Sequence, residues 1–295
     1  MRLQYSFVID ENPRFLAEAR LFVRALLGAG VAPADIVAQV TARCGEPGRA
    51  LAASFGVRAL ELPLGPDSTY CNKINQLFTL ANEEFDVLVA CDTDLAITRP
   101  LNSAASLHAI RAKRVDQPNP PLAVLESVRA FLQVPSQPAL LAPSIAAHES
   151  TYALNCNGGL LMIPRALMRP LGEQWLRNAE VLHDHRHLLQ RWVNHIDQVS
   201  FAFAMIQLGL PFDELPIDYN FPTTLAKQIP ASCYGEPIVL HYHRAIDRRG
   251  RIKRCGVPSV DALIKRVNRS LYPRRSLWAR LFRWSSAVNT PQRRQ

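Results

Sequence analysis

The chain has 295 residues, of which 48% are hydrophobic and 20% charged, and its formal net charge is +9 at pH 7. This composition is typical of a globular protein with a sizeable core, and it excludes a mainly disordered chain. The six cysteines show neither a CxxC pair nor zinc-site spacing, which predicts reduced thiols in a cytoplasmic protein. No apolar run has the length of a signal peptide or membrane span, so we expect neither.

Strand and helix patterns alternate along the first third of the chain. The expected elements are, in order, a strand over 5–10, a helix over 12–28, a strand over 35–41, a helix over 47–56, a strand over 57–63, a helix over 71–82 and a strand over 86–91. Asn12 suits the N-cap of the first helix, Pro13 its first turn and Gly28 its end. The alternation predicts an α/β fold whose mainly parallel sheet is covered by helices on both faces.

Two carboxylates follow the last of these strands, in "VLVACDTDLAITRPL". Asp92 and Asp94 stand two residues apart at a strand end, where ligands bind in such sheets. Like charges so placed repel each other unless a cation lies between them, and a divalent cation there also holds phosphate oxygens. The plain alternative is a polar turn after the strand. We interpret the motif as a metal and diphosphate site.

Two classes of enzyme have an Asp-x-Asp motif after an apolar strand. In phosphatases of the haloacid dehalogenase type the first aspartate, here Asp92, attacks phosphorus. Those enzymes place the motif after the first strand and carry Thr or Val where this chain has Leu95 and Ala96. We keep a phosphatase as an alternative function.

The order of five motifs resembles that of GT-A glycosyltransferases, especially glycosyltransferase family 8. The motifs are "NKINQL", "VLVACDTDLAITRPL", "NCNGGLLMIP", "HIDQVSFAFAM" and "IVLHYH". The resemblance covers roughly residues 3–245, and it implies a GT-A-like (Rossmann-like) fold with a mixed, mainly parallel sheet. It also implies transfer of a sugar from a nucleoside diphosphate sugar, most simply a UDP-sugar, to an acceptor hydroxyl.

The resemblance assigns a metal site and a nucleotide site. Asp92, Asp94 and His241 match the family's ligands for Mn²⁺ or Mg²⁺, and His243, which points the same way along a strand, is the second choice for the histidine. The nucleotide contacts implied are Asp10, Lys73, Asp92 and Thr93. Turn, surface and solvated-helix roles remain open for Asp10, Lys73 and the histidines.

Two further motifs would form the reaction side of the site. Asn157, Gly158 and Gly159 would contact the sugar or acceptor, because the glycines allow close approach of the backbone and Asn157 both donates and accepts. Asp197 and Gln198 match the family's pair at the reacting carbon, and are catalytic candidates. A tight turn and a helix N-cap are the structural alternatives for these two motifs.

The chain departs from the family after "LHYH". Family 8 enzymes usually continue with glycine and then Lys-Pro-Trp, whose lysine meets the diphosphate, whereas this chain reads "HYHRAIDRRGRIKR". Arg244, Arg248 and Arg249 are candidates to replace that lysine. Retention of the anomeric configuration is expected from the resemblance alone.

The chain divides into a catalytic domain over 1–245 and a basic tail over 246–295. A proline-rich insertion over 102–150 is expected to form an acceptor wall or lid. After residue 243 lie 15 of the 34 basic residues but only two of the 25 acidic ones. The tail ends in an amphipathic pattern in which Leu277, Leu281, Trp284 and Val288 share one face.

The basic tail suggests a partner other than the substrate. Residues 270–295 suit an anionic membrane surface, which predicts a peripheral protein at the inner face of the membrane and a glycan or lipid-linked acceptor of cell-envelope synthesis. The tail could instead dock on the catalytic domain, and a non-catalytic membrane-surface binding protein is a further alternative function. We expect no nucleic-acid partner, because no binding module and no interleaved aromatic platform is present.

Overall fold

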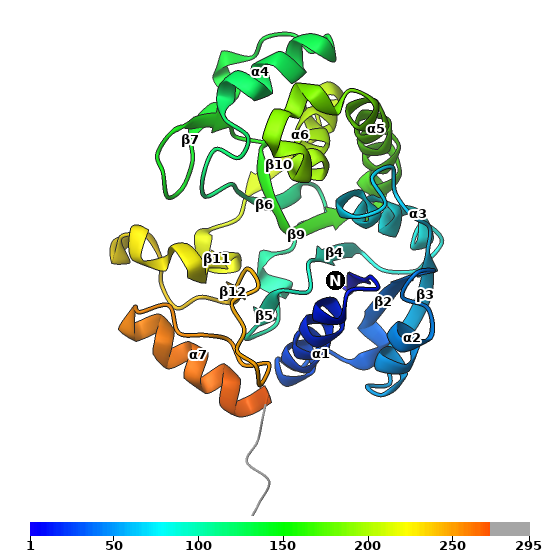
Figure 1. Cartoon of the computed structure of the whole chain (residues 1–295), viewed down its shortest axis with the longest axis vertical. Coiled ribbons are helices and arrows are strands. Elements are labelled where there is room, and N and C mark those ends of the chain that lie inside the picture. The colour runs from blue at the N-terminus through cyan, green and yellow to red at the C-terminus, as the bar shows by residue number, and fades with distance from the viewer. Residues whose placement is uncertain (272–295) are drawn as a thin grey trace, which may run out of the picture.

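A seven-stranded mixed sheet forms the centre of the molecule (Figure 1). The structure is a computed structural model, and it describes residues 1–271. In spatial order the strands are β10 (Phe212–Glu214), β6 (Ile110–Arg114), β9 (Cys156–Pro164), β4 (Val87–Cys91), β1 (Leu3–Ile9), β2 (Ile36–Thr41) and β3 (Arg58–Leu62). β9 is antiparallel to β4 and to β6, and the other neighbouring pairs are parallel. The expectation of a mainly parallel sheet is confirmed.

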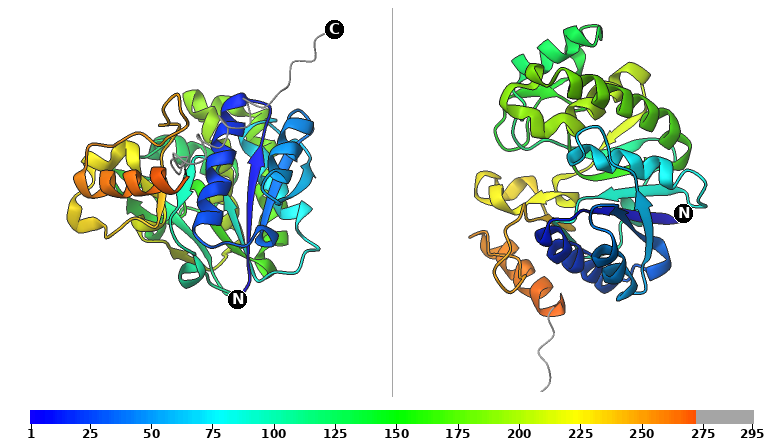
Figure 2. Two further views of the ribbon diagram at one scale, coloured as in Figure 1. Left: turned by 90° about the horizontal axis from the view of Figure 1, so that it is seen from below. Right: turned by 45° about the vertical axis from the view of Figure 1, so that its right-hand side comes forward.

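Helices cover both faces of this sheet, as Figures 1 and 2 show. The α-helices are α1 (Pro13–Gly28), α2 (Glu46–Ala53), α3 (Gln76–Thr79), α4 (Leu122–Phe131), α5 (Arg165–Asp184), α6 (Ile196–Leu208) and α7 (Pro258–Leu271). Short 3₁₀ helices are η1 (Pro33–Asp35), η2 (Tyr70–Asn75), η3 (Asn102–Ala104), η4 (Pro138–Leu140), η5 (Arg186–His195), η6 (Ile217–Tyr219), η7 (Thr223–Gln228) and η8 (Ala231–Cys233). α1 and α2 lie on one face, and α3 to α6 lie on the other.

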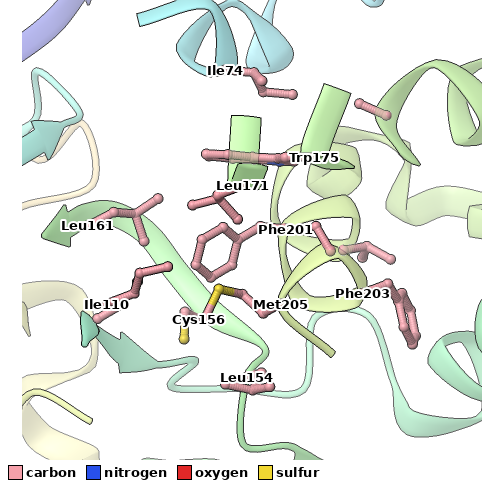
Figure 3. Packing of buried hydrophobic residues seen from close by; sticks show 14 of the residues in the cluster. Ile74, Ile110, Leu154, Cys156, Leu161, Leu171, Trp175, Phe201, Phe203 and Met205 are labelled. Carbon is pink, nitrogen blue, oxygen red and sulfur yellow. The ribbon is translucent and has the colours of Figure 1, made fainter. Parts of the chain in front are cut away.

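Alternation along the strands builds a separate core on each face, because successive side chains of a strand point to opposite sides. In β4, Val89 belongs to the core under α1 and α2, whereas Leu88 belongs to the core under α5 and α6. Figure 3 shows the second core, where Trp175 of α5 and Phe201 of α6 lie in one cluster with Leu161 of β9. The two ring centroids lie 5.1 Å apart in an edge-on arrangement. This packing fixes the start of α6 relative to the sheet.

The elements expected from the sequence are present, with one difference in type. Asn12 accepts a hydrogen bond from the backbone of Arg14, and Pro13 opens α1 as expected. The expected helix over 71–82 is instead the 3₁₀ helix η2 followed by the single turn α3. Side chains of η2 bond to the preceding loop: Asn72 accepts from the backbone N–H of Gly65, and Asn75 donates to the carbonyl of Pro63. These bonds hold η2 against the loop.

The segment over 102–150 holds a strand that the sequence pattern does not reveal. The sequence predicts an acceptor wall or lid for this segment but no strand, and its residues Ile110–Arg114 form β6, which pairs with β9 and β10. The strand was missed because its interior carries Lys113, a charged residue that is fully buried and paired with the carboxylate of Asp116. A charged residue at a buried strand position breaks the apolar alternation by which a strand is recognised in a sequence.

A second, three-stranded sheet lies beside the first and joins the C-terminal part of the chain to it. Its strands are, in spatial order, β11 (Phe221–Pro222), β12 (Val239–His241) and β5 (Leu95–Ile97). A separate two-stranded sheet is formed by β7 (Leu141–Pro143) and β8 (Ser150–Tyr152). α7 packs through Val260, Leu263 and Ile264 against the three-stranded sheet and against α1. Over residues 1–271 no helix is both long and apolar enough to cross a membrane. The amphipathic pattern over 277–288 lies outside the described residues.

Candidate active site

Three potential metal ligands converge where β4 and β12 end. Asp92 and Asp94 follow β4, and His241 is the last residue of β12. β12 pairs with β5 so that His241 lies opposite Leu95, the residue after Asp94. One ligand atom from each of Asp92, Asp94 and His241 can be chosen so that all lie within 4.8 Å of one another, and His241 Nε2 is 3.2 Å from Asp94 Oδ1.

The surroundings of His241 suit a cation at this position. Its Nδ1 lies 2.9 Å from Oδ1 of Asn220, and the amide nitrogen of Asn220 donates to Asn157 at 3.2 Å. Nδ1 therefore carries the proton in the neutral ring, and the Nε2 lone pair faces the Asp94 carboxylate. A divalent cation between these groups would accept both lone pairs. An imidazole held by a polar partner and joined by two carboxylates is a donor set suited to Mn²⁺.

Asp94 is held ionised at this position. Burial alone would raise its pKa, but the charge and hydrogen bond of His241 keep the pKa of Asp94 well below its ordinary value. The second-choice histidine, His243, stacks on the His241 ring with centroids 3.7 Å apart. Burial, followed by the charge of His241, lowers the pKa of His243 to about 3. Among the described residues the three-ligand group contains His241 and not His243.

Lys73 connects α6 with the loop that follows β4, residues 92–94, which is called the metal-side loop below. Its Nζ lies 2.8 Å from Asp92 Oδ1 and 3.1 Å from Asp197 Oδ2, and it donates to the carbonyl of Gly158 at 3.2 Å. Burial alone would lower the pKa of Lys73, but the two carboxylates raise it above its ordinary value. The ammonium therefore stays charged between the two aspartates. Lys73, expected near the nucleotide, lies close to both halves of the site.

The catalytic candidates lie at the start of α6, and other elements hold them there. The indole N–H of Trp175 donates to the carbonyl of Asp197 at 2.8 Å. The side chain of Gln198 contacts Nδ1 of His195 at 2.6 Å through its amide nitrogen, and its oxygen accepts from the N–H of Gly158 at 3.4 Å. The backbone of Asp197 and the side chain of Gln198 are therefore held by neighbouring residues. The N-cap alternative is not supported, because α6 begins at Ile196.

Gly158 and Gly159 lie within β9 and leave room for site side chains. A Cβ atom on Gly159 would lie 2.6 Å from Cε1 of His241, which real contacts do not reach. A Cβ atom on Gly158 would lie 3.1 Å from Nζ of Lys73. Asn157 accepts from the N–H of Gly159 and from Asn220. The tight-turn alternative for this motif is wrong, since the residues belong to a strand.

Asp10 and Thr93 are buried beside this group. Asp10 accepts hydrogen bonds from Thr41, Arg43 and Asn72, which tie the ends of β1 and β2 to η2. Thr93 is 3.5 Å from the carboxylate of Glu18, and its carbonyl accepts from the Tyr242 hydroxyl at 3.1 Å. Both residues line the same cavity. Contact of each with a nucleotide remains a prediction.

Two adjoining cavities meet at the ligand group. The first has a volume of about 440 Å³ and includes Asp10, Arg14 and Glu18 in its wall; the second, of about 500 Å³, includes Asn157, Asp197 and Gln198. The residues shared by both walls are Tyr70, Lys73, Asp92, Asp94 and Arg244. An elongated ligand occupying both cavities would therefore pass directly over the carboxylates.

Several residues at this site escaped prediction from the sequence. Glu18 lines the first cavity from α1, His195 lines the second, and Asn220 holds His241 from outside the expected motifs. Asn220 and Glu18 carry no motif signal. His195 directly precedes the "IDQ" of α6. Its closeness in sequence to Asp197 and Gln198 was the signal that could have placed it at the site.

The chain has the fold of GT-A glycosyltransferases. The galactosyltransferase LgtC, in complex with donor and acceptor sugar analogues, is similar over 94% of this chain and 99% of its own, with a TM-score of 0.57 and 14% identity. An active-site mutant of LgtC gives a TM-score of 0.59 at 13% identity, with the same coverage. Mouse xyloside xylosyltransferase 1 is similar over 82% of this chain and 97% of its own, with a TM-score of 0.50 and 15% identity.

Sequence comparison adds no family to this finding. No protein-family model matches the chain, and no curated protein matches it. At identities this low the structural similarity establishes the fold alone. A GT-A fold does not favour the phosphatase alternative.

Proposed function

We propose that the protein is a metal-dependent glycosyltransferase that moves a sugar from a nucleoside diphosphate sugar to an acceptor hydroxyl. The observation that carries the proposal is the meeting of two cavities over Asp92 and Asp94 at the carboxyl end of β4, with the third potential ligand, His241, in the wall of the second cavity. In a parallel α/β sheet this edge is where ligands bind. The names of the similar structures, galactosyltransferase and xylosyltransferase, support sugar transfer as the reaction.

The first cavity suits the nucleoside and the second suits the sugar and acceptor. Asp10 and Thr93 lie in the wall of the first, and Asn157, Gly158 and Gly159 in the wall of the second. The second wall is rich in amide, hydroxyl and carboxylate groups, which hydrogen-bond sugar hydroxyls. Part of that wall comes from Asp116, Gln117 and Asn119 of the 102–150 segment, which supports an acceptor-side role for it.

A bound Mn²⁺ or Mg²⁺ would be held by Asp92, Asp94 and His241, and would offset the charge of the leaving diphosphate. Lys73 keeps Asp92 and Asp197 in fixed positions through its two ion pairs. Asp197 offers negative charge to an anomeric carbon that becomes positive as the leaving group departs. Gln198, held by His195, orients the donor sugar. We propose retention of configuration, by analogy with the family that the motifs resemble.

Thermal stability tests this proposal directly. The purified protein would be heated with UDP, GDP, ADP or CDP, each with and without Mn²⁺. We expect one nucleotide, most simply UDP, to raise Tm only with the metal, and the Asp92→Ala, Asp94→Ala double variant to lose the effect. Asp213→Asn, an exposed aspartate of β10, is the control and should behave as the wild type.

Two outcomes would favour the alternatives. Release of phosphate from a monoester, with a phosphorylated Asp92, would establish the phosphatase instead. No shift with any metal and nucleotide would remove the support for a transferase and leave a non-catalytic surface-binding protein.

The acceptor is proposed to be a glycan or lipid-linked sugar of the cell envelope, with the protein on the inner membrane face. The support is the basic composition after residue 243. Co-sedimentation with vesicles containing anionic lipid, compared with neutral vesicles, tests this placement. A chain ending at residue 271 should lose the binding; equal binding by both lengths would contradict a role for 272–295.

A further inference from the structure

The wall shared by the two cavities, called the seam, carries charges of both signs. It includes the carboxylates of Asp92 and Asp94 and the cations of Lys73 and Arg244. Lys73 is already engaged, since carboxylate oxygens of Asp92 and Asp197 lie 2.8 and 3.1 Å from its Nζ. Within residues 1–271, by contrast, no carboxylate lies within ion-pair distance of the Arg244 guanidinium. Arg244 is therefore the seam cation with capacity for an anionic ligand.

The backbone that presents Arg244 has an uncommon conformation. φ is +43° at His243 and +68° at Arg244, two consecutive non-glycine residues in the left-handed region. Such positions cost free energy and persist where surrounding contacts enforce them. An unstrained continuation of β12 would carry the chain on in the strand direction. The two left-handed residues instead turn it where the cavities meet.

Hydrogen bonds to the metal-side loop enforce this turn. The N–H of Tyr242 donates to the carbonyl of Asp94 at 3.0 Å, and the Tyr242 hydroxyl donates to the carbonyl of Thr93 at 3.1 Å. The N–H of Ala245 then donates to the carbonyl of Tyr242 at 2.7 Å and closes the turn around Arg244. The position of Arg244 is thus coupled to the loop that holds the carboxylates.

We propose that Arg244 binds the diphosphate of the donor where the two cavities meet. The inference rests on the proposed function and specifies one of its contacts. A guanidinium can donate two parallel N–H bonds to phosphate oxygens, and it keeps its charge at any physiological pH.

Binding measurements on Arg244→Gln test the proposal. Titration calorimetry with Mn²⁺ would compare each nucleoside diphosphate that the wild type binds with the corresponding monophosphate. We expect affinity for the diphosphate to fall about 10- to 100-fold, as for loss of a hydrogen bond between charged groups, and that for the monophosphate to fall much less. Arg248→Gln, an exposed arginine of the same loop outside both cavity walls, is the control, and Arg244→Lys should retain part of the affinity.

A glycine variant separates binding from folding. Arg244→Gly removes the guanidinium but suits the left-handed backbone, so Tm should not fall while diphosphate affinity does. Wild-type diphosphate affinity in both Arg244→Gln and Arg244→Gly would overturn the inference and leave the proposed function intact. Equal losses for mono- and diphosphate would also overturn it. If the wild type binds no nucleoside diphosphate, the proposed function fails and the inference fails with it.

Discussion

The ammonium of Lys73 lies 3.1 Å from a carboxylate oxygen of Asp197. The two residues come from η2 and α6, and the side chain of Lys73 also reaches Asp92. The exposed fractions of the Lys73 and Asp197 side chains are 14% and 5%, so this ion pair is largely shielded from water. Its loss leaves buried charge without a partner.

Lys73→Met is therefore expected to destabilise the protein. Removal of one member of a buried ion pair costs about 3–5 kcal/mol, because the remaining carboxylate is left uncompensated. The free energy of unfolding would be measured with urea. Adding Asp197→Asn to Lys73→Met should recover part of the loss, and a double variant less stable than Lys73→Met alone would contradict this account.

Gly159→Ala is expected to disrupt the metal site without unfolding the protein. The new methyl group would lie 2.6 Å from the His241 ring and force it to move. Loss of a correctly oriented ligand lowers metal affinity by roughly 10- to 100-fold. Mn²⁺ binding followed by electron paramagnetic resonance measures the effect.

Gly158→Ala is the matched comparison for that substitution. Its methyl group would meet the flexible end of Lys73 at 3.1 Å, so Mn²⁺ affinity should change less. Equal effects of the two alanines on Mn²⁺ affinity would argue against close contact between β9 and His241.

Trp175→Phe tests how Asp197 is positioned. The substitution keeps most of the apolar packing seen in Figure 3 but removes the N–H that donates to the carbonyl of Asp197 at 2.8 Å. We expect a loss of about 1–3 kcal/mol in stability and a lower kcat with KM little changed. Val181→Ala, an exposed residue of the same helix α5, is the control. A variant with wild-type stability and kcat would refute this positioning role.

The buried carboxyl of Glu18 predicts a dependence of stability on pH. Burial, and then the charge of Asp94, raise the pKa of Glu18 from 4.5 to about 7, although Arg14 and Arg244 oppose the shift. The folded state therefore binds a proton that the unfolded state has lost between about pH 4.5 and 7. Across that window the free energy of unfolding falls as pH rises, by roughly 3 kcal/mol from this group.

Glu18→Gln should remove this part of the pH dependence. Urea unfolding of the wild type and variant at pH 5 and pH 8, with EDTA present, measures the difference. The variant should lose less stability than the wild type on going to pH 8, whereas Glu61→Gln, at an exposed position, should follow the wild type. Parallel curves for wild type and Glu18→Gln would show that the Glu18 carboxyl is not held in its neutral form.

Local patterns of the sequence were sufficient for the scaffold and for two of the three potential metal ligands. Apolar strands that alternate with capped helices specify the β1–α1–β2–α2–β3 unit, because both periodicities and the cap at Asn12 are properties of neighbouring residues. Asp92 and Asp94 are also recognised from a local pattern, because they are carboxylates directly after the buried strand β4. In contrast, β6 was hidden by Lys113, whose charge is balanced by a partner outside the strand.

His241 was expected from the family resemblance and not from any local pattern, and the tertiary structure decided how distant groups complete the site. The pairing of β12 with β5 places His241 beside Asp94, and η6 is followed by Asn220, whose side chain fixes the His241 ring. Arg244 reaches the seam because two left-handed residues redirect the chain there. The sequence by itself thus determined the elements and the carboxylates, since these depend on neighbours along the chain. Their partners were decided by strand pairing and helix packing, because such contacts join residues that no local pattern relates.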